Sequence, residues 1–164
     1  MSQINLYEAM SRYFEPGSLC RSGSPKAVIL MGGMTTGKTT IRRRQYGHGH
    51  VLIDAAQIFL DLCHGEVTTF PGAFKDDLEQ IGRLVSRRAT KERRHLVTEI
   101  IGDDFANTVR LIDALKKDGY LVDIVPVKCE AEASIERARD RLERAVSARY
   151  AGPMNTAWIL DALA

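Results

Sequence analysis

The sequence predicts an α/β fold in which a parallel sheet is covered by helices on both faces. Short apolar runs of strand length alternate along the chain with amphipathic stretches of helix length. The first of these runs leads through a glycine-containing turn directly into a stretch that suits a helix. Strands that alternate with helices are joined by right-handed crossovers and lie parallel. We therefore expect three layers, α/β/α, around a parallel sheet of four to five strands.

The turn after the first strand is the most informative segment of the chain. Gly32 and Gly37 enclose four residues, and Lys38 and Thr39 follow at once, which completes the P-loop motif GxxxxGK[ST]. Glycine lets the main chain wrap a phosphate so closely that several backbone N–H groups face it. Lys38 then reaches the outer phosphates, and the Thr39 hydroxyl binds Mg²⁺. The motif in this context predicts a P-loop NTPase fold. The expected nucleotide-binding residues of this segment are Gly32, Gly33, Met34, Thr35, Thr36, Gly37, Lys38, Thr39 and Thr40.

The remaining elements follow from periodicity and from stop signals. Helical spacing of apolar residues predicts an N-terminal helix over 3–14, ahead of a nucleotide core that spans 25–150. The predicted strands are 26–31, 51–53, 95–100 and 120–127. The predicted helices are 38–45, 55–62, a long one from Ala73, one capped by Asp103 or Asp104 with Phe105, Val109, Ile112 and Leu115 on its buried side, 130–150, and 157–163. Residues 64–72 are expected to form a loop that shapes a pocket.

Bulk composition limits the classes of protein that fit. The chain has 164 residues, 45% hydrophobic and 27% charged, which predicts a single domain over 1–164. A net charge of +2 is too weak to argue for nucleic acid or an anionic membrane as a partner. The N-terminal segment has neither a basic start nor a continuous apolar run, so we expect a cytoplasmic protein that does not enter a membrane. Three widely spaced cysteines indicate ordinary thiols, and His48 with His50 is only a weak metal signal.

Two acidic residues follow predicted strands. Asp54 comes directly after 51–53 and Glu99 lies at the end of 95–100. Ligands of parallel α/β sheets bind outside the carboxyl ends of the strands, so both carboxylates are expected near the P-loop. Asp54 is the candidate general base for an acceptor hydroxyl, and Glu99 is a candidate for the substrate site or for holding Mg²⁺. The alternatives are that Asp54 only caps the next helix and that Glu99 is out of register with the site.

The helix after the fourth predicted strand carries several arginines. Arg137 and Arg141 are four residues apart and project from one side, where they could close over the phosphates as a lid. Arginine neutralises the charge of a phosphoryl group in transfer and is always protonated. Arg149 is a further nucleotide-binding candidate, from the hinge after this helix. Acidic residues interleave with these arginines, so a solvated, salt-bridged helix is the alternative.

The order of these parts resembles the zeta toxin and chloramphenicol phosphotransferase group of small P-loop kinases. The resemblance spans residues 25–150 and includes Ser134-x-x-Arg137-x-x-x-Arg141. It implies that Lys38 and Thr39 bind ATP and Mg²⁺, that Asp54 acts on the substrate hydroxyl, and that Glu99 lies in the substrate site. It also implies that Arg137, with Arg141 or Arg149, contacts the triphosphate.

The leading hypothesis is therefore an ATP-dependent kinase that phosphorylates a hydroxyl of a small molecule or nucleotide-sugar. An inhibitory protein partner is compatible with a zeta-like toxin. Phosphorylation of a polynucleotide end is the first alternative, because Arg42, Arg43, Arg44 and the basic second half of the long helix from Ala73 could form a phosphate-tracking surface. Aromatic residues for base stacking are missing there, so a solvated face is the other interpretation. The second alternative is a nucleotide-dependent switch whose partner binds the N-terminal helix or the segment at Trp158.

Overall fold

Four parallel strands form the centre of the protein, in a computed structural model that describes residues 10, 11, 13–62, 75–143 and 153–164. The strands are β1 (Lys26–Met31), β2 (Val51–Ile53), β3 (Leu96–Ile100) and β4 (Leu121–Pro126). Their order in the sheet is β2-β3-β1-β4, and every neighbouring pair is parallel. The predicted α/β class is confirmed, and each predicted strand is present to within one residue at either end.

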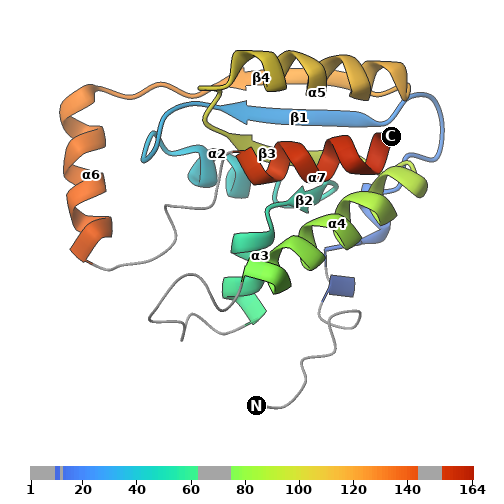
Figure 1. The fold of residues 1–164 in the computed structure, drawn as a ribbon, viewed down its shortest axis with the longest axis horizontal. Helices are drawn as coiled ribbons and strands as arrows, with labels where there is room; N and C mark the ends of the chain where they lie inside the picture. The colour runs from blue at the N-terminus through green and yellow to red at the C-terminus, as the bar shows by residue number, and fades with distance from the viewer. Residues whose placement is uncertain (1–9, 12, 63–74, 144–152) are drawn as a thin grey trace.

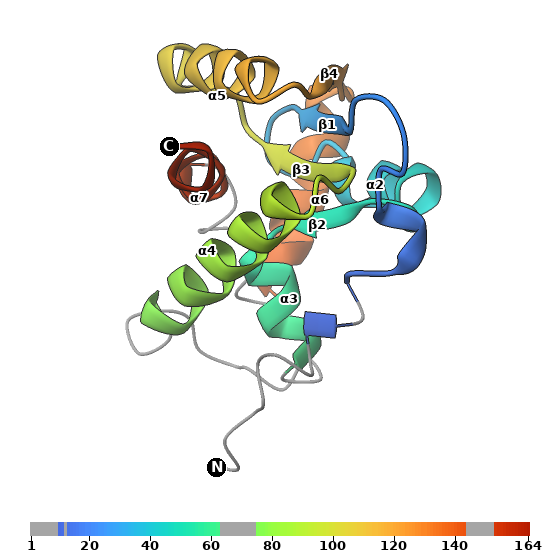
Figure 2. The same cartoon turned by 90° about the vertical axis from the view of Figure 1, so that its right-hand side faces the viewer.

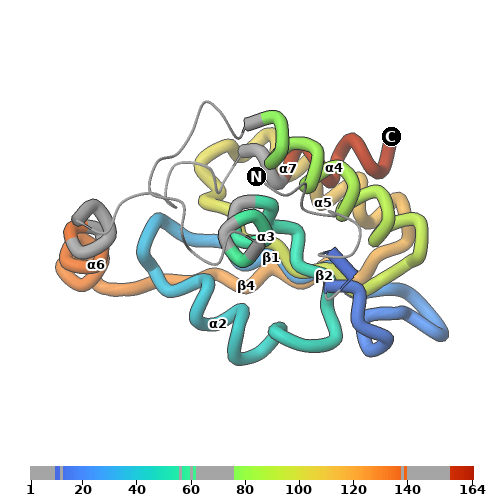
Figure 3. Tube along the Cα trace, turned by 90° about the horizontal axis from the view of Figure 1, so that it is seen from below, coloured from blue at the N-terminus to red at the C-terminus, as the bar shows by residue number. Residues whose placement is uncertain are grey.

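Helices cover both faces of the sheet, but unequally. Figure 2 shows α4 and α7 on one side of the strands and α2 on the other. Helix α6 stands apart from the sheet, beyond the arrowhead end of β1 in Figure 1, and it is also separate in Figure 3. The described helices are the short 3-10 helix η1 (Pro16–Ser18), α2 (Lys38–Gln45), α3 (Ala55–Leu62), α4 (Lys75–Lys91), α5 (Phe105–Lys117), α6 (Ala131–Glu143) and α7 (Pro153–Leu163). Most of the predicted N-terminal helix, the loop 64–72 and the last part of the predicted helix 130–150 lie outside the described residues.

The hydrophobic core divides into two clusters because side chains alternate across each strand. Ala27 and Ile29 of β1 point into the larger cluster, which α4, α5 and α7 cover. Val28 and Leu30 point into the smaller one, under α2. On the larger side, α7 packs tightly on α4, since the ring of Trp158 lies where a side chain at Gly82 would be.

The buried face of α5 differs from the prediction. Phe105 is 79% exposed and Val109 is also exposed, whereas Thr108, Leu111 and Leu115 are buried. The helix is rotated so that Phe105 and Val109 fall on its flank. Asp104 caps it as expected, by accepting a hydrogen bond from the Asn107 N–H at 3.0 Å. The prediction holds for Leu115, which is buried, and for Ile112, which packs against the core. It is wrong for Phe105 and Val109, because Thr108 occupies a core position that apolar periodicity overlooks.

The described residues contain no helix that combines the length and the apolar character needed to span a membrane.

Candidate nucleotide and phosphoryl-transfer site

The P-loop lies between β1 and α2, and its two motif glycines are required by the geometry. A side chain at Gly32 would collide with the carbonyl oxygen of Val127. Gly37 has φ +101°, a left-handed conformation that other residues adopt only with strain. Lys38 is buried, and its Nζ donates to the carbonyl oxygens of Gly32 and Gly33, each at 2.7 Å. The lysine is thus folded back over the loop, at the place where its charge would meet a bound phosphate.

Glu99 lies directly beneath the P-loop helix and is held there by two α2 side chains. The Thr39 hydroxyl donates to Oε2 of Glu99 at 2.9 Å, and Nε of Arg42 donates to Oε1 at 2.6 Å. Arg42 and Glu99 have side chains only 8% and 6% exposed, so this ion pair is buried. The Thr39 hydroxyl and a carboxylate oxygen are hard ligands of the kind Mg²⁺ prefers, and they lie within hydrogen-bond distance of each other beside the loop. These two residues therefore fit a magnesium ion bound with nucleotide.

The register of the sheet brings Asp54 next to Glu99. Ile53 of β2 pairs with Thr98 of β3, and Asp54 and Glu99 are the residues that follow. Leu30 of β1 pairs with Glu99, which places the start of the P-loop on the other side of the same strand end. The sequence could only place both acids after strands. The pairing shows that they occupy neighbouring positions at the carboxyl ends of β2 and β3.

Asp54 also caps α3. Its Oδ1 accepts a hydrogen bond from the Gln57 N–H at 3.0 Å, so the capping role weighed from the sequence is present. Capping does not exclude a second role, because a carboxylate has two oxygens and the bond to Gln57 fixes its orientation. The function of Asp54 as a base stays a prediction.

Helix α6, the predicted lid, contacts the P-loop through its first turns. Nη1 of Arg137 donates to the Thr35 carbonyl at 3.2 Å and lies 3.9 Å from where a side chain at Gly37 would begin. Ser134 and Thr35 are joined by their hydroxyls at 2.7 Å. The Arg141 side chain and all of Arg149 lie outside the described residues, so their predicted contacts with nucleotide stay untested.

Arg42 has a role that sequence reasoning missed. It was grouped with Arg43 and Arg44 in a possible phosphate-tracking surface, but Arg42 is buried against Glu99 and only its two neighbours are exposed. That surface therefore loses Arg42. The spacing could have predicted this role. Arg42 comes three residues after Thr39 and so lies on the same side of α2, the side that faces Glu99.

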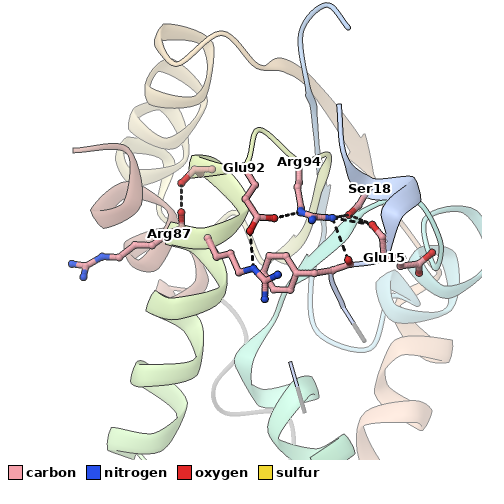
Figure 4. A network of polar contacts seen from close by, with 8 residues as sticks. Glu15, Ser18, Arg87, Glu92 and Arg94 are labelled. Atoms are coloured by element: carbon pink, nitrogen blue, oxygen red, sulfur yellow. Dashed lines mark hydrogen bonds and ion pairs between the residues drawn. The ribbon is translucent and has the colours of Figure 1, made fainter. Parts of the chain in front are cut away.

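A second polar cluster lies at the opposite end of the strands, where β3 begins (Figure 4). Nε of Arg94 donates to Glu92, and its Nη1 donates to the carbonyls of Phe14 and Glu15 and to the Ser18 hydroxyl. Burial alone would raise the pKa of Glu92, but hydrogen bonds from Arg88 and Arg94 outweigh it and hold the pKa below its ordinary value. This cluster ties the N-terminal segment to the sheet.

The parallel sheet with the P-loop between β1 and α2 defines a P-loop NTPase fold. A family model described as Zeta toxin matches residues 12–156. The chain belongs to the zeta toxin family.

A solved structure has the same fold. The chain is similar to a protein of the PezAT chromosomal toxin-antitoxin system of Streptococcus pneumoniae, with a TM-score of 0.60 and 20% sequence identity. The match covers 88% of this chain but 65% of that one, so this chain spans less than two thirds of the matched protein. A comparison with curated protein sequences finds no match.

Proposed function

We propose that the protein is an ATP-dependent kinase that transfers the γ-phosphoryl group of MgATP to a hydroxyl of a small molecule or nucleotide-sugar in the cytoplasm. The observation that carries this proposal is the set of polar groups beside the P-loop, at the carboxyl ends of β2 and β3. Glu99 is hydrogen-bonded to Thr39 of the P-loop, and Asp54 occupies the neighbouring strand end. Besides its cap on α3, the second carboxylate supplies the proton acceptor that transfer to a hydroxyl requires. Membership in the zeta toxin family supports the same activity.

Each residue has a separate task in the proposed reaction. MgATP, when bound, supplies the phosphoryl group and neutralises part of its charge. Lys38 exchanges its two loop carbonyls for phosphate oxygens, and Thr39 with Glu99 holds the metal ion. Asp54 accepts the proton of the acceptor hydroxyl, whose oxygen bonds to the γ-phosphorus as the bond to the ADP oxygen breaks.

Arginine side chains complete the charge balance in this proposal. Arg137 already hydrogen-bonds the P-loop backbone, which supports a place near the transferred group. Arg141 and Arg149 are assigned to the triphosphate by the family resemblance. Such cationic groups stabilise charge that develops in the transition state, because they are fixed before the reaction begins.

The test is incubation of the protein with γ-labelled ATP, Mg²⁺ and a cell metabolite extract. We expect label on a small molecule with the wild-type protein and none with Lys38→Ala. Label only in free phosphate would contradict the kinase and favour a nucleotide-dependent switch. Label on the ends of nucleic acid, removed by nuclease, would favour a polynucleotide kinase.

The two roles of Asp54 can be separated with a matched pair of caps. Asp54→Asn should keep the α3 cap, because asparagine caps as well as aspartate, yet lower transfer by about 10²- to 10³-fold as the base is lost. Asp104→Asn changes the cap of α5 in the same way and should leave transfer and melting temperature unchanged. Undiminished transfer by Asp54→Asn would show that Asp54 only caps the helix.

An inhibitory protein partner is part of the proposal. It is supported by the likeness to a protein of a toxin-antitoxin system. If the chain is a toxin of this kind, its expression in a bacterium should arrest growth and Lys38→Ala should not. Arrest by both variants would show that the effect does not depend on the proposed phosphoryl transfer.

A further inference from the structure

The P-loop contains a strained threonine that the nucleotide-binding motif does not require. Thr35 has φ +62°, in the left-handed region that β-branched residues rarely adopt, and it is buried. Glycine would adopt this conformation without strain, and the motif allows any residue at the position. Strain at a functional loop persists where the side chain contributes something that offsets it.

The Thr35 hydroxyl fastens the loop to α6. Its Oγ1 lies 2.7 Å from both the carbonyl and the hydroxyl oxygen of Ser134, and 2.6 Å from the carbonyl of Met34. The Ser134 hydroxyl in turn lies 3.0 Å from the Met34 carbonyl. The two hydroxyls have one proton each to donate. If Thr35 donates to Met34, the Ser134 hydroxyl can donate to Met34 or to Thr35, and otherwise Thr35 itself donates to Ser134, so each way of satisfying these contacts includes a bond between loop and helix.

This contact determines where Arg137 lies. Ser134 and Arg137 are three residues apart and therefore share a face of α6. With Ser134 held at Thr35, the guanidinium of Arg137 reaches the Thr35 carbonyl and lies 3.9 Å from where a side chain at Gly37 would begin. The hydroxyl pair thus places a positive charge beside the position of the phosphates.

The rest of the described part of α6 has little other support. Figures 1 and 3 show this helix apart from the sheet and its covering helices, and it packs extensively against no other described element. Ile135 and Arg139 are both exposed. Its attachment in the described residues is therefore concentrated at contacts of Ser134 and Arg137 with the P-loop residues Met34 and Thr35.

We propose that Thr35 is a positioning residue that latches the lid helix to the P-loop and so places Arg137 over the phosphates. Because Thr35 belongs to the phosphate-binding loop, any change of the loop on nucleotide binding moves the attachment point of α6 directly. The part that concerns phosphoryl transfer rests on the proposed kinase activity, whereas the attachment itself does not.

The attachment is tested without nucleotide, by hydrogen exchange of the α6 amides with β1 amides as the internal reference. Thr35→Gly and Thr35→Ala both remove the hydroxyl, and we expect exchange in 131–143 to rise about tenfold, the value of one ordinary hydrogen bond. Ser134→Ala should act in the same direction. Thr35→Ser keeps the hydroxyl and should retain most of the protection. Unchanged exchange in Thr35→Ala would overturn the latch.

The role of strain is tested by the melting temperatures of the same variants. Alanine keeps a Cβ at positive φ and glycine does not, so Thr35→Gly should melt above Thr35→Ala. Equal melting temperatures would remove the strain argument.

Nucleotide readouts separate this inference from the proposed function. With an active wild type, Thr35→Gly and Ser134→Ala should lower kcat/KM for MgATP about tenfold, with recovery in Thr35→Ser. Wild-type kcat/KM in both variants would overturn the positioning role. A wild-type protein that transfers no phosphate would reject the kinase, while the exchange measurement would still decide on the latch.

Discussion

Two arginine–glutamate pairs lie at opposite ends of β3, and they differ in how completely their hydrogen bonds are satisfied. At the start of the strand, Arg94 bonds Glu92 and also reaches two backbone carbonyls and a hydroxyl (Figure 4). At the end of the strand, Arg42 bonds Glu99 alone, and its buried Nη2 has no hydrogen-bond partner among the described residues. A complete polar network is typical of a structural cluster, since an unpaired buried donor costs free energy. The incomplete pair lies where a ligand is proposed to bind.

The largest expected effect comes from replacing the incomplete pair as a unit. In the double variant Arg42→Met with Glu99→Met, no charge is left unpaired, so we expect the free energy of unfolding to stay within about 1 kcal/mol of wild type or to rise. Phosphoryl transfer should fall about 10²- to 10³-fold, because an oxygen proposed for Mg²⁺ is gone. Transfer assays and urea unfolding measure the two quantities.

The matched single variant for that measurement is Glu99→Met. It leaves the Arg42 guanidinium buried without its counter-charge, so it should lower the free energy of unfolding by about 3–5 kcal/mol. Retention of activity in the double variant would contradict the role of Glu99 in the site.

The complete pair should behave in the opposite way. Arg94→Ala removes bonds to Glu92 and to the N-terminal segment, and we expect it to lower the free energy of unfolding by about 2–4 kcal/mol. Transfer per folded molecule should stay at the wild-type level. Arg87→Ala is the control, since Arg87 is exposed on α4 nearby, and its cost should stay below about 0.5 kcal/mol. A specific loss of transfer in Arg94→Ala would mean that the two ends of the strand are coupled.

The smallest expected effect is a loss of stability at low pH, and it concerns His95 at the start of β3. Burial and the nearby charge of Lys26 lower the pKa of His95 from its ordinary 6.5. His95 Nδ1 accepts a hydrogen bond from the Lys26 backbone N–H at 2.9 Å, which protonation would break. The unfolded chain binds this proton at higher pH than the folded one, so stability is present above pH 6.5 and falls as the pH drops toward the folded pKa.

Melting curves between pH 7.5 and 5.5 measure this loss. The wild type should lose roughly 2–4 °C from this bond. His95→Asn offers an acceptor that does not titrate, so its decline should be smaller. The pKa of His50 is also lowered, chiefly by burial, and adds a loss of the same sign in both proteins. An equal decline in wild type and His95→Asn would contradict the role assigned to His95.

The sequence predicted the strands and the P-loop because both have strong local signals. β1 is an apolar run before a motif with fixed spacing, and Gly32 and Gly37 are where the backbone requires them. It also placed Asp54 and Glu99 at strand ends. That the two acids lie side by side depends on strand order and register. These arise from packing across the whole sheet, so no local sequence pattern predicts them.

Side-chain partners were harder to predict than elements. Arg42 is charged and lies among other arginines, so composition favoured an exposed position, and only tertiary contact with Glu99 accounts for its burial. The positive φ of Thr35 could not be predicted, because the motif allows any residue at that position. The exposed Phe105 shows that an apolar side chain on a predicted helix does not identify the face that packs.

β4 is one of the two edge strands of the sheet, with β2 at the other edge, since among the described residues it pairs with β1 alone. It carries exposed Leu121 and Ile124, so its outer backbone could template the addition of strands from other molecules. Two features oppose this: Asp123 is an exposed charge in the middle of the strand, and Pro126 lacks an N–H at its end. Asp123 and Pro126 therefore oppose the addition of strands at this edge. Of the two, the charge of Asp123 is the one whose removal we expect to promote aggregation first.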